Sequence, residues 1–400
     1  MVAMDQLHAF CQSLIRIPSL SGEEQEIATH IAIAMKQLGY DAVHIDAYGS
    51  VTGSLFGKEA GPSILLDGHI DTVGITNPEL WTHDPYRAQI VEGKLYGRGS
   101  SDMKCALAAM ILAASDYAKQ TAKAFKGSIH VSATVCEECF EGVAARLVSE
   151  RVKPDLVIIG EATNLALNHG QRGRAELVVE AEGVSCHSSN PEKGVNAIES
   201  MLKVLPPILN LPVGEHPILG KGILVLTDII SDPYPGRSVL PSRCRATFDR
   251  RLLPQETRES VLAPIQAILD QVKASVSISQ GSIRCYTGAT IDAKRFFPAW
   301  VLDEDDPVVV EAQRALKESG LKAPRSHYSF CTNASHFAAE ANIPTLGFGP
   351  SLEEFAHTVD EYCLLEQLDQ AYKGYSALLA HFTTSGAPCI QKPHKNKENS

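Results

Sequence analysis

Several features that would assign a chain of 400 residues to a particular class are missing here. No apolar run approaches the roughly 18 residues that cross a bilayer, so we expect no membrane-spanning helix. Acidic residues (47) outnumber basic ones (36), and no basic cluster precedes the C-terminal tail, which argues against a nucleic-acid partner. The glycine-containing segment GKLYGRG (93–99) has neither phosphate-loop spacing, which argues against nucleotide binding. The first twenty residues lack a basic start before a continuous apolar stretch, so we expect an amphipathic helix there and not a signal peptide. We therefore expect a cytoplasmic protein.

The cysteines lack the spacing of a small disulfide framework. Ten are scattered along the chain, so we expect free thiols in a reducing compartment. Cys136 and Cys139 form a C-x-x-C pair, which suggests redox chemistry or a zinc clip. A redox pair normally begins a helix, where the dipole lowers one thiol pKa, whereas Cys136 ends a strand pattern. We therefore interpret these thiols as incidental, and expect the function of the segment to lie in Glu137 and Glu138 between them.

The order of predicted elements indicates two domains, because the chain is too long for one ordinary core. Strands and helices alternate up to about residue 175 and again from about 295, which predicts an α/β domain with a mostly parallel sheet. The intervening elements follow the order β-α-β-β-α-β, which is the ferredoxin-like order. We therefore predict a discontinuous domain over 1–175 and 292–385, interrupted by a ferredoxin-like α+β domain over 176–291. The polar tail 386–400 is predicted to be disordered.

Polar residues follow the strands of the predicted α/β sheet. Strand patterns end on His69 and Asp71, on Glu137 and Glu138, and on Glu161, while Asp102 precedes a long helix and His357 follows a late strand. Ligands of open α/β sheets bind beyond the carboxyl ends of the strands, so these side chains should converge. Imidazole and carboxylate are ligands for zinc and similar metals, and crowded carboxylates need cations to offset their repulsion. The pattern predicts a two-metal site able to activate a water molecule.

These motifs resemble a known metallohydrolase family that includes acetylornithine deacetylase, succinyl-diaminopimelate desuccinylase, aminoacylase and glutamate carboxypeptidase. Each motif is weak alone, but together they cover nearly the whole chain in the family's order. They are GHIDTV (68–73), GRGSSDMK (97–104), EE (137–138), GEATN (160–164), GVSCHSS (183–189) and GPSLEEFAH (349–357). The segments CTNAS (331–335) and DRRL (249–252) are more similar to the subgroup of selenium-metabolism-linked hydrolases.

The resemblance implies a ligand set for two Zn²⁺ ions, with Co²⁺ or Mn²⁺ as alternatives. His69 and Glu161 would bind one ion, Glu138 and His357 the other, and Asp102 would bridge them.

Two further residues of the strand ends are implied to act beside the metals. Asp71 would orient the ring of His69. Glu137 would be the general base, taking a proton from the metal-activated water and passing it to the leaving amine.

The resemblance also implies roles for residues outside the metal centre. His187, in the inserted lid, would stabilise the oxyanion in a partner subunit's site, so a homodimer through the lid is expected. Arg251 would bind a substrate carboxylate, with Arg250 left open as the competitor on the opposite strand face. Asn333 is a candidate substrate-binding residue. Ser238 stands where many members have asparagine, so substrate specificity transfers poorly from relatives.

The leading hypothesis is therefore a metal-dependent amidohydrolase that cleaves a small N-acyl amino acid, of the deacetylase or desuccinylase type. A carboxypeptidase or dipeptidase with the same dimetal centre is the alternative within the enzyme class. A catalytically silent relative that only binds a ligand is the alternative outside it. The expected partners are a small N-acyl amino acid or short peptide and a second copy of the chain, with no nucleic acid and no membrane.

Overall fold

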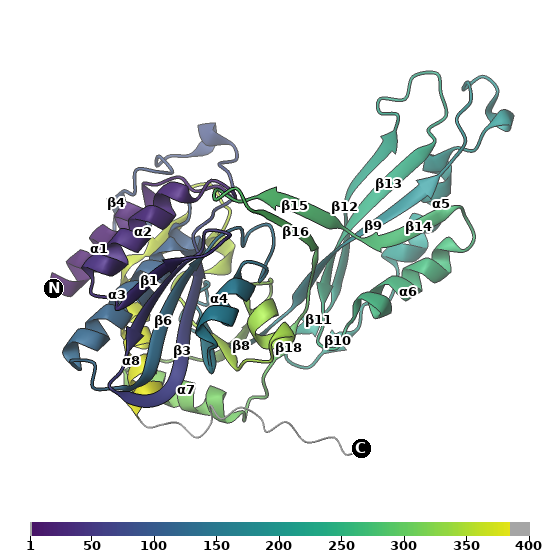
Figure 1. Ribbon diagram of the computed structural model, residues 1–400. Coiled ribbons are helices and arrows are strands. Elements are labelled where there is room, and N and C mark those ends of the chain that lie inside the picture. The colour runs from purple at the N-terminus through teal and green to yellow at the C-terminus, as the bar shows by residue number, and fades with distance from the viewer. Residues whose placement is uncertain (1, 385–400) are drawn as a thin grey trace, which may run out of the picture.

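The computed structural model describes residues 2–384 and contains two parts, each built around its own sheet (Figure 1). We call the part around the nine-stranded sheet the large domain and the part around the five-stranded sheet the small domain. The helices are α1 (Val2–Ile15), α2 (Gln25–Gln37), α3 (Cys105–Gln120), α4 (Ala145–Val152), α5 (Ala197–Leu209), α6 (Arg258–Leu269), α7 (Pro307–Glu318) and α8 (Leu365–Thr384). None of the helices within 2–384 is long and apolar enough to cross a membrane.

The large sheet is parallel at its centre and mostly antiparallel at its sides, where only β19 pairs with β8 in parallel among the described strands. Its order is β1-β2-β6-β3-β7-β20-β8-β18, with β19 also paired to β8. The pairs β6–β3, β3–β7 and β7–β20 are parallel, whereas β1–β2, β2–β6, β20–β8 and β8–β18 are antiparallel. The strands are β1 (Ala42–Ile45), β2 (Val51–Phe56), β3 (Glu59–His69), β6 (Lys126–Thr134), β7 (Leu156–Ile159), β8 (Leu167–Gln171), β18 (Trp300–Val301), β19 (Arg325–Tyr328) and β20 (Thr345–Gly347). The mostly parallel sheet expected from sequence is confirmed for the central strands.

The central strands are apolar on both faces because helices cover both. Along β3, Ile64 and Leu66 lie in the core cluster that includes α3 and α8, whereas Leu65 packs with Ala145 and Val148 of α4 in a separate cluster. Successive side chains of a strand point to opposite faces, so each face has its own helical layer. This burial fixes the strand ends, and with them the polar residues that follow.

The small domain has the predicted β-α-β-β-α-β order and a ferredoxin-like sheet. Its strands lie in the order β12-β13-β9-β14, all antiparallel, with α5 and α6 packed on the sheet (Figure 1). The strands are β9 (Gly173–Glu182), β12 (Ile223–Asp232), β13 (Arg243–Leu252), β14 (Ala274–Ile278) and β17 (Phe296–Phe297), and a small hairpin, β10 (Glu215–His216) with β11 (Gly220–Lys221), precedes β12.

A hairpin that follows β14 reaches from the small domain to the large one. Strands β15 (Gln280–Arg284) and β16 (Thr290–Lys294) run from the small domain toward α2 and β1 (Figure 1). Cys285 and Ile291 are buried in the core of the large domain, and the Tyr286 hydroxyl donates to the Gly49 carbonyl at 2.8 Å. Sequence analysis assigned most of this hairpin to the inserted domain, but its buried side chains pack with the large one.

A three-stranded sheet lies beside the large one and consists of β4 (Ile90–Val91), β5 (Lys94–Tyr96) and β21 (Tyr362–Leu364). Its strand β21 directly follows the loop that carries His357. The tail 386–400, predicted to be disordered, lies outside the described residues.

Candidate metal centre

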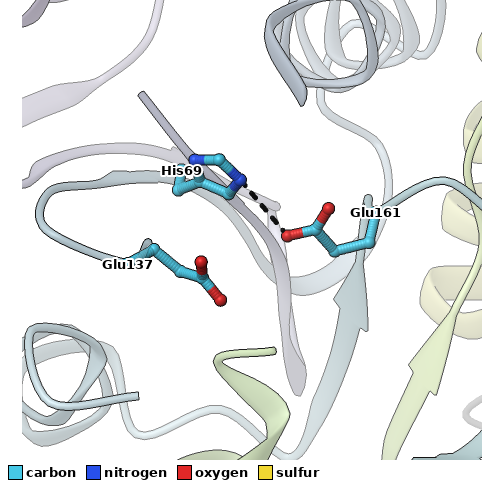
Figure 2. Close-up of side chains that lie close together, drawn as sticks. All are labelled: His69, Glu137 and Glu161. Atoms are coloured by element: carbon cyan, nitrogen blue, oxygen red, sulfur yellow. Dashed lines mark ion pairs between the residues drawn. The ribbon is translucent and has the colours of Figure 1, made fainter. Parts of the chain in front are cut away.

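Three carboxylates lie close to His69, which ends strand β3. His69 Nε2 lies 2.8 Å from Asp102 Oδ1 and 3.4 Å from Glu161 Oε1, and Glu137 reaches the same space from the loop after β6 (Figure 2). The Nδ1–H of His69 donates to the main-chain carbonyl of Asp71 at 2.8 Å, so Nε2 is the ring nitrogen that would bind a metal. Such a second-atom hydrogen bond is typical of a metal-binding histidine.

A second group shares Asp102 with the first. His357 Nε2 lies 3.1 Å from Asp102 Oδ2 and 3.0 Å from Glu138 Oε2. The two carboxylate oxygens of Asp102 therefore face different histidines, Oδ1 toward His69 and Oδ2 toward His357. The five ligands predicted from sequence thus form two groups with one carboxylate in common.

Asp71 holds the two glutamates rather than the ring of His69. Its carboxylate oxygen Oδ1 lies 3.6 Å from His69 Nδ1, too far for a hydrogen bond. The main-chain carbonyl of Asp71 accepts from Nδ1 instead. Its Oδ1 accepts the N–H of Glu137 at 3.0 Å, and its Oδ2 accepts the N–H of Glu138 at 3.1 Å and the hydroxyl of Ser21 at 2.7 Å. The carboxylate of Asp71 therefore fixes the turn that presents both glutamates, a contact that sequence analysis did not predict.

Glu137 is the buried carboxylate without a role in this network. Its side chain is 6% exposed, and Oε1 has no hydrogen-bond partner among residues 2–384. Burial raises the pKa of Glu137 well above its usual range, and the nearby charge of Glu161 acts in the same direction. A carboxyl of raised proton affinity beside a ligand group suits a residue that takes up and releases protons.

The charges of the centre fit bound cations. Burial, with the charge of Asp102 as a further cause, raises the pKa of Glu161 to about 7, and hydrogen bonds to Asp102 and Glu138 raise the pKa of His357 to about 10. Both shifts express an excess of buried negative charge that protons offset here. Divalent cations would offset it more fully, and imidazole with carboxylate is a donor set that they accept.

A cavity of about 200 Å³ opens beside the two groups and reaches the small domain. Arg251 of β13 lines it, and its partner within the chain is Asp249, at 2.9 Å. Arg250 points to the opposite face of the strand, where it is buried and paired with Glu256. Of the two arginines left open by the sequence, Arg251 faces the cavity and Arg250 does not, while the binding of a substrate carboxylate stays a prediction.

A second arginine of the cavity is already neutralised. Arg174 of β9 lies opposite Arg251 in the sheet register and forms a two-point ion pair with Glu141, at 2.5 and 2.8 Å. Glu141, four residues after Glu137, was not predicted from sequence. Arg251 has a single ion-pair contact, with Asp249, and its side chain is more exposed than that of Arg174 (28% against 16%), so it is the arginine of this wall better placed to bind a further anion.

Asn333 and His187 lie outside both the cavity and the metal groups. Asn333 is 3% exposed; its amide donates to Asp67 and Thr134 and accepts from the N–H of Gly142, so its polar atoms are used within the protein. His187 is exposed in a loop of the small domain, bridged to Val239 beside Ser238. Within one chain, the structure thus leaves both residues outside the metal groups, and their substrate and oxyanion roles stay predictions.

The C-x-x-C cysteines make no metal or disulfide site in the described chain. All nine cysteines of residues 2–384 are free, and Cys136 is buried with its thiol 3.5 Å from Glu24 Oε1. Burial raises the pKa of the Cys136 thiol, the opposite of what redox chemistry needs.

The chain is similar to known proteins both in sequence and in fold. Residues 65–381 match the model of peptidase family M20/M25/M40. The uncharacterized protein YgeY of Escherichia coli (strain K12) is 33% identical over 377 residues, covering 92% of each chain. A succinyl-diaminopimelate desuccinylase of Cereibacter sphaeroides is 27% identical and covers 94% of this chain and 98% of that one. The crystal structure of aminopeptidase PepT from Bacillus cereus has a TM-score of 0.73 at 18% identity, over 95% of this chain and 98% of that one, which shows a shared fold.

Proposed function

Because the chain belongs to peptidase family M20/M25/M40, and so is a metallohydrolase of amide or peptide bonds, we propose that it deacylates a small N-acyl amino acid at a two-metal centre. The observation that carries this proposal is the position of Asp102, whose two oxygens face two separate histidine–carboxylate groups beside the buried Glu137.

The proposed ligands are His69 and Glu161 for one ion, Glu138 and His357 for the other, and Asp102 for both. Zinc is the proposed metal, with cobalt or manganese as alternatives. When bound, the two cations supply Lewis-acid polarisation of the substrate carbonyl and lower the pKa of the attacking water.

Glu137 carries the proton transfers. Its carboxylate takes a proton from the water that attacks the amide carbon, and then donates it to the nitrogen as the C–N bond breaks. Its burial keeps bulk water from competing for that proton. The products are a carboxylic acid and a free amine.

Arg251 is the proposed contact for a substrate carboxylate. It faces the cavity, is partly exposed, and its guanidinium lies 2.9 Å from Asp249. A guanidinium binds a carboxylate through two parallel hydrogen bonds, which would orient the amide toward Glu137.

The second copy of the chain is also a proposal. Strand β12 is the edge of the small-domain sheet, and it exposes four large apolar side chains, Ile223, Val225, Ile229 and Ile230, between 37% and 48%. Edge strands with exposed apolar residues favour pairing with another chain. A homodimer formed there, in the reducing cytoplasm that the free cysteines favour, would supply His187 to the neighbouring site.

Substrate class is the finer part of the proposal, and a peptidase with the same centre is the second candidate. The desuccinylase of Cereibacter sphaeroides supports a deacylase, and the likeness to an aminopeptidase is one of fold. The test is release of amine from a panel of N-acetyl, N-succinyl and N-formyl amino acids and dipeptides, with added Zn²⁺ and with a chelator. Chelator-sensitive cleavage of one acyl class supports the proposal, cleavage of dipeptides alone favours the peptidase, and no cleavage of any member favours a silent relative.

A further inference from the structure

Glu361 is a buried carboxylate that connects the segment of Asp102 with the segment of His357. It follows His357 by four residues, directly before β21, and is 1% exposed. Its Oε1 accepts the main-chain N–H of Ser101 at 2.8 Å and that of Asp102 at 3.1 Å. Its Oε2 accepts from the guanidinium of Arg98 at 2.5 Å.

The backbone around Asp102 needs such an acceptor. Gly99, which precedes the turn Ser100–Lys104, has a φ of 83°, and Asp102 itself has a φ of −129° and a ψ of 93° inside that turn. These are not helical angles, so the N–H groups of this turn cannot all be satisfied as in a regular helix. A buried N–H without a partner is costly, and Glu361 satisfies two in succession.

The second oxygen of the Glu361 carboxylate, Oε2, is held by Arg98. Arg98 is also 1% exposed, and its guanidinium lies 5.4 Å from the ring centre of Trp81. The pair of Glu361 and Arg98 is close to neutral as a whole, so its main effect on the centre is geometric. Neither residue lines the cavity.

We propose that Glu361 is a positioning residue that acts through the main chain of Asp102 and sets its carboxylate between the two metal groups. The inference rests on the proposed function, because it assigns Glu361 a role toward the bridged two-metal centre. It predicts that the hydrogen-bond acceptor at position 361 matters, and that the negative charge does not.

Two double variants of the full chain separate these contributions. Glu361→Gln with Arg98→Met removes both charges but retains one oxygen to accept the two N–H groups. Glu361→Met with Arg98→Met removes the charges and the acceptor together. Replacing a buried ion pair by apolar residues of similar volume is often tolerated, so both variants should fold.

The measurement is a calorimetric Zn²⁺ titration of chelator-stripped protein, followed by the visible spectrum of the Co²⁺-loaded form. We expect the glutamine pair to bind two ions with near wild-type affinity, and the methionine pair to bind one of them about 10- to 100-fold more weakly. Glu340→Gln, which breaks an ion pair with Arg146 away from the centre, is the control and should bind as wild type does.

The outcomes are distinct. Equal Zn²⁺ affinities and equal Co²⁺ spectra in the two double variants would overturn the role of Glu361 while leaving the proposed function intact. Wild-type protein that binds fewer than two ions would overturn the proposed function and this inference with it. A loss of thermal stability without a change in metal affinity would show a purely structural role for Glu361, and so would also overturn the inference.

Discussion

Two neighbouring glutamates differ in what their carboxylates contact. Glu138 lies 3.0 Å from His357, whereas Glu137 Oε1 has no hydrogen-bond partner in the described chain. Asp71 accepts the main-chain N–H of both, so the two residues differ in the direction of their side chains. Adjacent residues at one strand end can therefore serve as a ligand and as a base.

Exchanging each of the two for glutamine tests this division. Glu137→Gln should lower kcat by about 10²- to 10⁴-fold and leave two metal ions bound, because only a proton acceptor is lost. Glu138→Gln, the matched variant, should lower metal content as well. Activity and metal stoichiometry are measured on the same preparations. Near wild-type turnover by the Glu137 variant would remove Glu137 as the base.

The arginines at 250 and 251 allow a similar comparison. Arg251→Met should raise KM for a carboxylate-bearing substrate about 10- to 100-fold with little change in thermal stability, because a charged hydrogen bond to substrate is lost. Arg250→Met should instead destabilise the fold by roughly 1–3 kcal/mol, since Glu256 and the main-chain carbonyls of Val213 and Ile223 each lose a donor. Steady-state kinetics and thermal melts of both variants measure these effects. Reversed results would mean that Arg251 has a structural role.

At the residue scale, site residues that follow strands could be predicted from the sequence, whereas residues placed by contacts with distant parts of the chain could not. His69, Glu138 and Glu161 follow apolar strands, and this made their convergence predictable. Neither Glu141 nor Glu361 follows such a pattern. The signal for Glu361 was its place four residues after His357, but its partners, Ser101 and Arg98, are some 260 residues away in the chain.

Among the elements, β2 and β6 are joined by a buried histidine. His130 of β6 is 5% exposed and hydrogen-bonds to Ser54 of β2 at 2.8 Å and to Ser128 at 2.9 Å. Burial lowers the pKa of His130 to about 4, below the value near 6.5 of an unfolded chain. The fold thus favours the neutral ring, and this contribution is fully present above pH 6.5 and is lost as the pH falls toward 4.

The acid stability of this pair of strands can be measured. Between pH 6.5 and 4, wild-type protein should lose on the order of 3 kcal/mol more stability than His130→Gln, which does not titrate. Thermal melts at a series of pH values give the slopes. His44→Gln, on the partly exposed β1, is the control and should keep the wild-type slope. Parallel slopes for wild type and His130→Gln would contradict the prediction.

Element prediction succeeded where apolar period and length were clear. The parallel strands at the centre of the large sheet and the ferredoxin-like order are confirmed. Strand β8 was missed because its sequence, LNHGQ, has one aliphatic residue and is a strand through its pairing with β19, β20 and β18. The hairpin of β15 and β16 was missed for a related reason, since it is stabilised by contacts with the distant loop at Ala47 and Gly49.

For the whole molecule, the main untested prediction is a site completed by a second copy. Co-expression of Glu137→Gln and His187→Ala chains with different tags, followed by purification on both tags, would give the mixed dimer. If His187 acts in the neighbouring site, that dimer has one competent site and should show about half of wild-type activity, whereas each variant homodimer is nearly inactive. An inactive mixed dimer would place His187 in its own subunit's site, and failure to recover any would contradict the homodimer.

The hairpin of β15 and β16 also has a consequence for engineering. The chain enters the small domain through β9, and after β14 it forms a hairpin whose Cys285 and Ile291 are buried in the large domain's core, before β17 pairs with β9 again. A chimaera that exchanges the insertion at residue 291 would therefore cut inside β16, and hairpin residues of the donor would have to pack against the native core of the large domain. Exchanging only the residues from β9 to β14 keeps the native hairpin of β15 and β16 in the large domain's core. These are the boundaries we would choose for grafting a relative's small domain.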